Sequence, residues 1–507
     1  QFELSSAEAK LTIDFDQSFN HSLLLHQSNG ELLLKQPLNS STLNASLSHC
    51  NFDLIWSVTT SDQTLLFGVK CVQRDSIESF QDEFSRSLWE STNKKPFTKV
   101  AKSDREWVLN ARRPPSFILS SSSDDSDDGQ HQLSFVMSDD DDDNDDNGGQ
   151  SDYSDFFSCS SKNRHLSVSY NTDRSFVSRG NTIGVFKQDG DSLAYCNSLA
   201  PLTSNNGEKF EPEAVMLHNQ DQSLLVLNEK EKNSIYRMDL NRGEVVEQFK
   251  INENFPIDKL GAHDKYAQCT PEQTLIGLNS NGVFLIDPRL PGEKQVDQAS
   301  FMYKRSARAN LSCLATTSTG AILTGSSNGD VRLYSSSLWK TGVKDALNRA
   351  PRAKTKLPGL GDPVIGVDCT SDGKWILITY PTYIFLVSAS IQGVTGGGFE
   401  RSLQRNKPLP IMLQLSPQHV QMLGGKFQFK PAKFDVGKSL EKSITTAAGC
   451  YIFVWNFRRV RSGITTDYQF KKYRQEVTLD QFVFDNARNV VVTLEHDIAL
   501  AKRIEMP

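Results

Sequence analysis

A sevenfold repeat in the C-terminal two thirds of the chain constrains its fold more than any other feature. Each unit has a strand-like run, a short polar turn and a second run that begins with Ile or Val, as in ILTGSSNGDVRLY around Val331. The intervals between successive anchor residues are 52, 48, 48, 53, 68 and 46 residues. The seven anchors are Ile183, Ile235, Val283, Val331, Ile384, Ile452 and Ile498.

The repeat predicts a seven-bladed, WD-repeat-like β-propeller over residues 165–507, because each interval accommodates a β-hairpin and two further strands. The β-branched anchors suit a half-buried pleated surface. Turns such as Asn281-Gly282 and Asn328-Gly329 use the residues that tight hairpins require. A β-sandwich is the alternative fold, but sandwiches rarely repeat seven times at such even spacing. The fold class is therefore mainly β.

The two ends of the repeat suggest how the ring closes. The seventh unit stops soon after its anchor, and the run HLSVSY at residues 165–170 precedes the first unit. We expect this run to become the outer strand of the seventh blade. Such a strand would remove the exposed edges that an open ring presents.

Residues 1–112 show a different pattern. Short runs with near-alternating apolar residues, such as KLTIDF, HSLLLHQ and DLIWSVTT, give about six strands. The run DSIESFQDEFSRSLWEST then places Phe80, Phe84 and Trp89 near one face at helical spacing. Six strands followed by one amphipathic helix predict a pleckstrin-homology-like barrel whose open end the helix plugs. A generic α+β domain is the alternative.

Residues 113–164 form an acidic linker between these two regions. The stretch 124–155 contains 13 aspartates and neither Lys nor Arg, whereas the formal net charge of the whole chain is −6. The rest of the chain is therefore slightly basic. Aspartates at this density repel one another, which predicts disorder. Three serines with an acidic residue three positions later are candidate phosphorylation sites: Ser121, Ser122 and Ser138.

A basic insertion lengthens the interval after the fourth anchor. Insertions in propellers usually form loops on the rims, and a long loop on a rigid scaffold is a favourable place for binding. We interpret this one as a candidate interaction loop for an acidic partner, a phosphate or the aspartate tract; a merely solvated loop is the alternative. Its basic residues are Lys340, Lys344, Arg349, Arg352, Lys354 and Lys356.

The sequence carries no pattern that predicts a catalytic centre, a metal site or a cofactor. The eight cysteines are scattered singly, which favours reduced thiols over disulfides or zinc ligands. There is no HExxH, GxSxG or GxxxxGK[ST] motif. No apolar run is long enough for a transmembrane helix. These observations lead us to expect a cytoplasmic protein, with a nuclear location as the alternative.

Several long phrases of the second half resemble the vacuolar import and degradation protein 27 family, which includes the plant "defective embryo and meristems" proteins. They are DRSFVSRGNTIGVFK, YRMDLNRGEVVEQFKI, KTKLPGLGDPVIGVDCTSDGKWIL and FKPAKFDVG followed by YIFVWNFRRV. The resemblance implies a cytoplasmic, non-enzymatic protein linked in fungi to vacuolar degradation of gluconeogenic enzymes. In plants it implies a link to development and to a Ran-type GTPase. The resemblance supplies no binding residues.

Three functions follow from this sequence. We favour a protein-interaction scaffold in which the propeller and the N-terminal domain each bind a protein. The second is a hydrolase or lyase with a site in the propeller channel. The third is an adaptor recruited to membranes by phosphoinositides, although the stretch SFNHSLLLHQSNGELLLKQ between its first strands contains Lys35 as its only Lys or Arg. Nucleic-acid binding is not expected, because the aspartate tract would oppose it.

Overall fold

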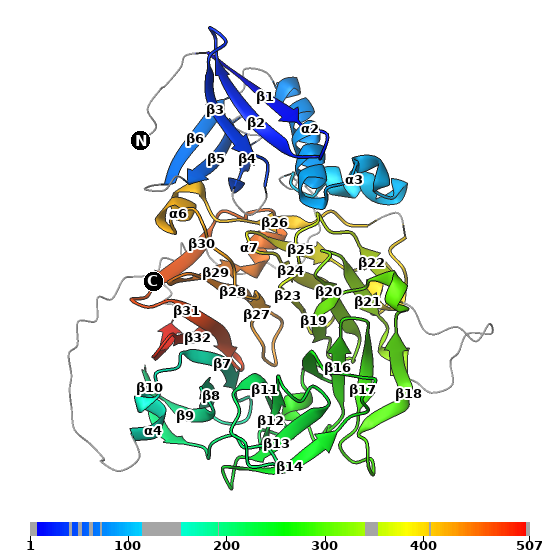
Figure 1. Ribbon diagram of the computed structural model, residues 1–507, viewed down its shortest axis with the longest axis vertical. Helices are drawn as coiled ribbons and strands as arrows, with labels where there is room; N and C mark the ends of the chain where they lie inside the picture. The colour runs from blue at the N-terminus through cyan, green and yellow to red at the C-terminus, as the bar shows by residue number, and fades with distance from the viewer. Residues whose placement is uncertain are drawn as a thin grey trace.

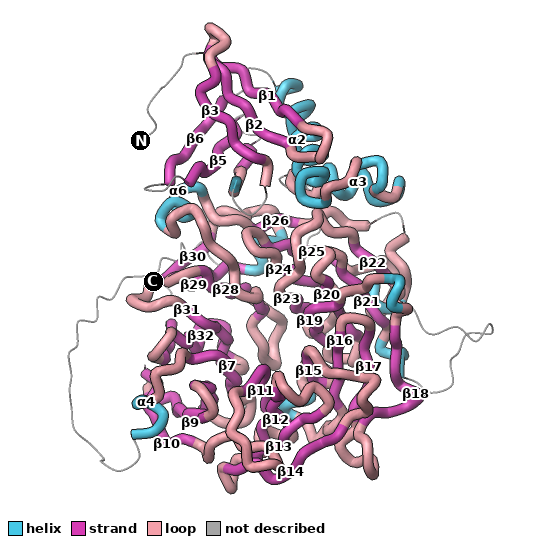
Figure 2. The backbone as a smooth tube through the Cα atoms, viewed as in Figure 1, coloured by secondary structure: helices cyan, strands magenta, loops and turns pink. Residues whose placement is uncertain are grey.

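The computed structural model describes residues 8–39, 43–48, 53–59, 64–70, 74–113, 154–190, 192–339, 353–404 and 407–502. An N-terminal unit, residues 8–113, lies against a larger ring of sheets formed by residues 154–502 (Figure 1). Strands dominate the ring, and its short helices occur in the connections and near its N-terminal entry (Figure 2).

The ring consists of seven antiparallel sheets whose strands are hydrogen-bonded in chain order. The first three sheets are β7 (Asn163–Val168), β8 (Arg174–Arg179), β9 (Thr182–Asp189) and β10 (Ser192–Ser198); β11 (Pro212–His218), β12 (Ser223–Asn228), β13 (Ser234–Asp239) and β14 (Glu244–Lys250); and β15 (Lys259–Ala262), β16 (Leu275–Asn279), β17 (Gly282–Ile286) and β18 (Gln295–Met302).

The next three sheets are β19 (Leu311–Thr316), β20 (Ile322–Ser326), β21 (Val331–Tyr334) and β22 (Thr355–Leu357); β23 (Gly366–Cys369), β24 (Trp375–Thr379), β25 (Ile384–Ser388) and β26 (Ile411–Leu413); and β27 (Lys433–Phe434), β28 (Ser443–Ala448), β29 (Tyr451–Asn456) and β30 (Tyr468–Lys472). The seventh comprises β31 (Val477–Val483), β32 (Asn486–Leu494) and β33 (Ile498–Lys502). Short helices of the ring are α4 (Ser154–Ser158), η2 (Ala267–Cys269), η3 (Arg305–Ala307), η4 (Ser336–Trp339), α5 (Gly397–Glu400), α6 (Pro417–Met422) and α7 (Phe457–Arg461).

The first strands of the sheets line the centre of the ring. β7 contacts both β11 and β31, and β19 contacts both β15 and β23. The predicted seven-unit β-propeller pattern is thus present, and each anchor lies at or next to the start of the third strand of its sheet. Six of the seven anchor side chains are at most 1% exposed, whereas Ile498 in the seventh sheet is only half-buried.

The predicted closure by residues 165–170 is wrong. Most of that run lies in β7, which pairs with β8 as the innermost strand of the first sheet. Because the first sheet takes all four of its strands from residues 163–198, the run is not available to the seventh. The ordered ring also begins upstream of residue 165, since Phe156 of α4 is fully buried.

Side-chain hydrogen bonds join the first and seventh sheets in place of an exchanged strand. The amide Nδ2 of Asn163 donates to the carbonyl oxygens of Leu494 and Asp497, both at 2.9 Å. The guanidinium of Arg179 donates from Nε to Asn163 Oδ1 at 3.0 Å and from Nη2 to the His496 carbonyl at 2.6 Å. It also donates to the Phe156 carbonyl and lies over the Phe156 ring. We call Asn163 and Arg179 the closure clamp.

The described residues of the N-terminal unit include two three-stranded antiparallel sheets and the helices α2, η1 and α3. Its elements are β1 (Ala9–Phe15), β2 (His21–Gln27) and β3 (Leu32–Pro37) in one sheet; β4 (Ser46–Ser48), β5 (Asp53–Thr59) and β6 (Thr64–Lys70) in the other; and α2 (Arg74–Asn93), η1 (Phe97–Lys99) and α3 (Lys102–Asn110). Trp56 and Phe84 pack in one core with leucines of both sheets. Strand-then-helix order agrees with the sequence pattern, although Trp89 is only half-buried and packs against Phe97.

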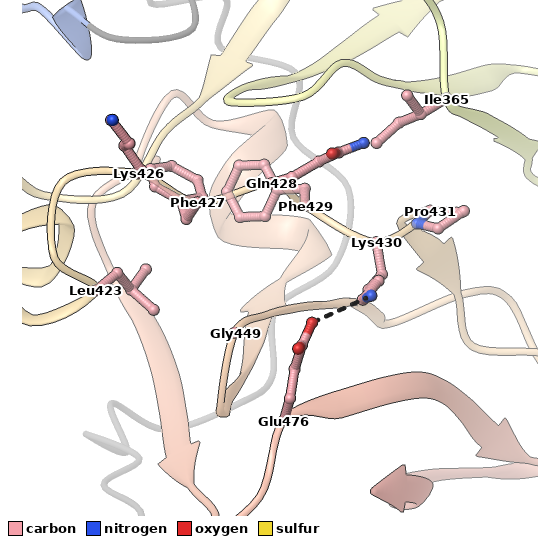
Figure 3. Close-up of a pocket in the computed structure, with 10 residues that line it drawn as sticks. All are labelled: Ile365, Leu423, Lys426, Phe427, Gln428, Phe429, Lys430, Pro431, Gly449 and Glu476. Carbon is pink, nitrogen blue, oxygen red and sulfur yellow. Dashed lines mark ion pairs between the residues drawn. The ribbon is translucent and has the colours of Figure 1, made fainter. Parts of the chain in front are cut away.

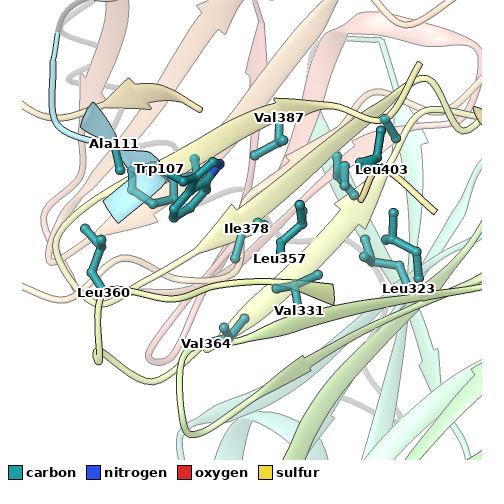
Figure 4. Close-up of a cluster of buried hydrophobic side chains, with 14 of the residues drawn as sticks. Trp107, Ala111, Leu323, Val331, Leu357, Leu360, Val364, Ile378, Val387 and Leu403 are labelled. Atoms are coloured by element: carbon teal, nitrogen blue, oxygen red, sulfur yellow. The ribbon is translucent and has the colours of Figure 1, made fainter. Parts of the chain in front are cut away.

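Helix α3, which the sequence pattern did not predict, joins this unit to the ring (Figure 4). Trp107 is 3% exposed, meets the Phe385 ring edge-on at 5.8 Å and donates from Nε1 to the Pro408 carbonyl at 2.8 Å. Ala111 is buried in the same cluster, which also contains side chains of the fourth and fifth sheets. Asn93 adds a hydrogen bond to the Leu360 carbonyl at 3.0 Å. The two parts of the molecule therefore share one hydrophobic core.

Candidate functional site: a pocket on one face of the ring

The structure describes two of the six residues of the predicted interaction loop. Lys354 and Lys356 flank Thr355 on β22, the outermost strand of the fourth sheet, and both are exposed. The ammonium of Lys356 lies 3.6 Å from a carboxylate oxygen of Asp330 in the same sheet. The remaining loop residues and the three candidate phosphorylation sites lie outside the described residues: Lys340, Lys344, Arg349, Arg352, Ser121, Ser122 and Ser138.

A pocket of about 470 Å³ lies elsewhere, on the face of the ring where connections lead from one sheet to the next (Figure 3). The segment between β26 and β27 supplies most of its wall, and connections next to β23, β29 and β31 supply the rest. The lining residues are Ile365, Leu423, Lys426, Phe427, Gln428, Phe429, Lys430, Pro431, Gly449 and Glu476.

Backbone hydrogen bonds hold the wall segment in place. The Phe429 amide donates to the Pro381 carbonyl at 2.8 Å, and the Lys430 amide donates to the Ala447 carbonyl at 2.8 Å. These bonds tie the segment to the fifth and sixth sheets. Phe429 is 1% exposed and meets the half-buried Phe427 ring edge-on at 5.2 Å. The wall is therefore preformed, as ligand sites usually are.

The N-terminal unit borders the same segment. The Asn44 side chain donates to the Gly425 carbonyl at 3.2 Å, and Gln421 of α6 donates to the Thr64 carbonyl at 3.0 Å. Gly425 has a φ of +74°, and a Cβ there would lie 2.2 Å from Thr59 Oγ1. Only glycine permits this close approach between the wall segment and the N-terminal unit.

Charge and apolar surface meet in the pocket. The ammonium of Lys430 lies 3.6 Å from Glu476 Oε1, and Lys426 is exposed beside the Phe427 ring. An apolar wall with a few charged groups at its rim is the composition of a peptide-binding depression. Such a site suits a segment that inserts an apolar side chain and presents an acidic group to the lysines. Sequence reasoning missed it because KFQFK matches no motif with a known mechanism.

The charge of Lys430 also acts on a buried carboxyl group, that of Asp480 on β31. Burial raises the pKa of Asp480 to about 6, although Lys433, a hydrogen bond from the Thr445 hydroxyl and Lys430 oppose the rise. The Thr445 hydroxyl donates to Asp480 Oδ2 at 2.9 Å. The folded protein thus favours the neutral acid more strongly than the unfolded chain does, and the carboxyl group is mostly neutral only below pH about 6.

The pH dependence of stability tests this assignment. Because the pKa of Asp480 is higher in the folded than in the unfolded chain, its stabilising effect is present below pH about 4 and is lost as the pH rises through about 6. Between pH about 4.5 and about 7.5, the wild type should lose about 2 kcal/mol relative to Asp480→Asn. Urea unfolding of both proteins across this range measures the difference. A pH-independent difference would contradict the assignment.

The centre of the ring contains a second concentration of polar groups. The connection between β15 and β16 reaches across the central opening: Tyr266 donates to the Gly437 carbonyl at 3.0 Å, and Gln268 donates to the Val168 carbonyl at 3.0 Å. The ammonium of Lys265, whose side chain is 7% exposed, lies 3.2 Å from Asp368 Oδ1. Burial opposes the charge of Lys265, but Asp368 and other neighbouring groups raise its pKa overall.

Two carboxylates that contact this crossing segment, Asp221 and Asp368, are also bonded to other protein groups. Asp221 accepts hydrogen bonds from the Ser169 hydroxyl, the Tyr170 and Asn171 amides and the Gln268 side chain, at 2.7–2.8 Å. Asp368 likewise accepts from the Phe434 amide at 2.8 Å. Bonds of this kind position loops, so these groups hold the crossing segment in place at the centre of the ring.

The described part of the chain contains neither a metal-binding cluster nor a membrane-spanning helix. No group of three or more His, Cys, Asp or Glu side chains in it is arranged to hold a metal ion. None of its helices combines the length and the apolar character needed to cross a membrane.

Residues 161–506 match the family described as "VID27 C-terminal WD40-like domain". Two relatives are named "Vacuolar import and degradation protein 27". The chain is 37% identical to that of Schizosaccharomyces pombe over 456 residues, covering 84% of this chain and 55% of the relative. It is 29% identical to that of Saccharomyces cerevisiae over 476 residues, covering 88% and 59%.

Among solved structures, the chain resembles the β-propeller domain of Cps50 (Swd1) from Myceliophteria thermophila, with a TM-score of 0.47 and 11% identity. That match covers 67% of this chain and 97% of the other. The chain spans somewhat more than half the length of its two relatives. Because the family match covers every strand of the ring and most of the chain, this chain belongs to the VID27 family.

Proposed function

We propose that this chain is a non-enzymatic scaffold in the cytoplasm that brings proteins together for vacuolar import and degradation. The observation that carries the proposal is the preformed pocket with aromatic walls and a charged rim. A pocket of this size accommodates a few side chains of a protein partner. Its partners are proteins with an exposed segment that pairs an apolar residue with an acidic one.

The N-terminal unit supports a second binding function. Two three-stranded antiparallel sheets followed by the long helix α2 agree in element order with a pleckstrin-homology-like barrel. Trp56 of β5 packs with Phe84 and Leu88 of α2 in its core, as expected for a helix that closes one end of such a barrel. We assign this unit to protein binding, and a Ran-type GTPase is a candidate partner by family resemblance.

The link to vacuolar import rests on the family. Both fungal relatives carry that function in their names, and the matches cover 84% and 88% of this chain. The chain spans little more than half of each relative. A role of this chain in vacuolar import and degradation is therefore a proposal.

Substitution of the pocket tests the scaffold function. Lys426→Glu combined with Phe427→Ser changes one exposed and one half-buried side chain, so the ring should still fold. The double substitution removes a central apolar contact and reverses a rim charge. It should lower the affinity for a partner that binds the pocket by about tenfold or more. Affinity purification of the tagged full chain from cells, with quantitative mass spectrometry, measures the loss.

Lys250→Glu is the matched control, because it reverses an exposed charge on β14, the outer strand of the second sheet, away from the pocket and from the candidate interaction loop. The control should retain all partners of the wild type. Equal recovery of every partner by the pocket variant and the wild type would contradict the proposal.

A further inference from the structure

The seventh sheet differs from the other six in its outer strand. Each of the first six sheets has four strands, whereas the seventh has three within the described residues, β31, β32 and β33. β33 is last in its sheet, so its outer edge pairs with no described strand. An open edge presents backbone donors and acceptors to any extended segment that approaches it.

The register shows which backbone groups face this edge. The Leu494 amide donates to the Asp497 carbonyl at the β32–β33 turn. Since hydrogen-bonded pairs alternate along an antiparallel ladder, Val492 and Ala499 form the next bonded pair. The backbone groups of Ile498 and Leu500 therefore point away from β32. The Ile498 amide donates at 2.7 Å to the side chain of the adjacent Asp497, as expected of an outward group without a strand partner.

Side-chain burial indicates the same gap. The six anchors in four-stranded sheets are at most 1% exposed, because their neighbours include a fourth strand. Ile498, the equivalent anchor of the three-stranded sheet, is half-buried. The ring thus has a place for one more strand, and an additional strand there would cover Ile498.

We propose that residues 132–137 of this chain, QLSFVM, bind β33 as the missing fourth strand. This segment lies outside the described residues, between Arg113 and Ser154. It contains Leu133, Phe135 and Met137 at alternate positions, the period of a strand with one buried face. The only other apolar run in this interval, at residues 117–119, has three residues and is too short for a typical strand.

The path of the chain gives the segment both the reach and the direction that it needs. The chain re-enters the described structure at α4 and arrives at the β32–β33 turn, where Lys162 pairs with Glu495 and Asn163 donates to Asp497. An antiparallel partner of β33 would end beside this same turn. The residues between 137 and 154 can span about 50 Å when extended, which is more than twice the length of a strand.

Hydrogen exchange of the full chain tests the proposal without disrupting the ring. In the wild type, the outward amide of Leu500 should be protected. Leu133→Asp combined with Phe135→Asp should increase its exchange rate about tenfold or more, because the added strand cannot bury two carboxylates. Phe117→Asp combined with Leu119→Asp is the matched control and should leave Leu500 unchanged. Exchange in β13, a third strand with a described fourth-strand partner, reports whether either variant perturbs the fold.

Each alternative occupant predicts a different result. Lack of protection at Leu500 in the wild type would overturn the proposal. If the Leu500 amide stays protected in the Leu133→Asp, Phe135→Asp variant, the proposal is also overturned. Protection that depends on protein concentration would then assign the edge to a second copy of the chain, and protection that does not would assign it to residues 503–507. A change limited to Leu500 and its neighbours in the 132–137 variant, with β13 unaffected, supports it.

Discussion

Replacing Trp107 by alanine is expected to lower the free energy of unfolding by about 3–5 kcal/mol. The indole is 3% exposed and contacts a core shared by the N-terminal unit and the fourth and fifth sheets. Truncation leaves a cavity beside Phe385 and removes the donor to the Pro408 carbonyl. Because these contacts cross the junction, the N-terminal unit should also separate from the ring more readily.

Thermal unfolding and limited proteolysis measure the two effects. The variant should melt at a lower temperature, and cleavage between the two parts should precede unfolding of the ring. Glu106→Ala is the control, since Glu106 is exposed on the same helix and its loss should change stability by about 0.5 kcal/mol or less. Wild-type stability of the Trp107 variant would show that the parts are not joined through this core.

Replacing Arg179 by methionine should destabilise the ring by about 3–5 kcal/mol. The side chain is 2% exposed, and its guanidinium bonds the first sheet, the seventh sheet and α4 at once. Methionine keeps the aliphatic stem but leaves the Asn163 amide oxygen and the His496 and Phe156 carbonyls without this donor. Buried acceptors that lose a charged donor are costly.

Because the closure clamp lies between the first and seventh sheets, Arg179→Met should loosen the ring at this junction first. Hydrogen exchange should rise earliest in β7 and β33, on the two sides of the junction, before it rises in the third and fourth sheets. Arg164→Met serves as the control, because Arg164 is half-exposed and pairs with surface carboxylates. Uniform loosening of all seven sheets would indicate that Arg179 does not hold the junction.

The sequence predicted the repeated architecture because its signal is local. Each anchor marks the start of a third strand next to a tight turn, and both features depend on residues close together in the chain. The helix α2 follows from period alone in the same way. Closure could not be predicted, because whether residues 165–170 pair with the first or the seventh sheet is decided by contacts distant in sequence. Arg179 in the clamp looks like any other charged residue of a strand.

The pocket and the junction were missed for a related reason. Phe427 and Phe429 become a wall only when the Pro381 and Ala447 carbonyls fix the backbone between them. Trp107 lies in a short polar helix with no strong apolar stripe, and its partners are about 300 residues away in the chain. Composition singled out the basic insertion, but most of it lies outside the described residues, so its role stays a prediction.

Direct contact between the N-terminal unit and the ring would hold the two proposed binding surfaces at a fixed separation within one molecule. The shared core around Trp107 and the bond from Asn44 to Gly425 leave no flexible tether to set that distance. A ligand with two matching segments would therefore meet the second surface at high effective concentration after binding the first, and a ligand with another spacing would gain nothing. Under the proposed function, the selectivity of the molecule would depend on the distance between its two binding surfaces as well as on the affinity of each surface.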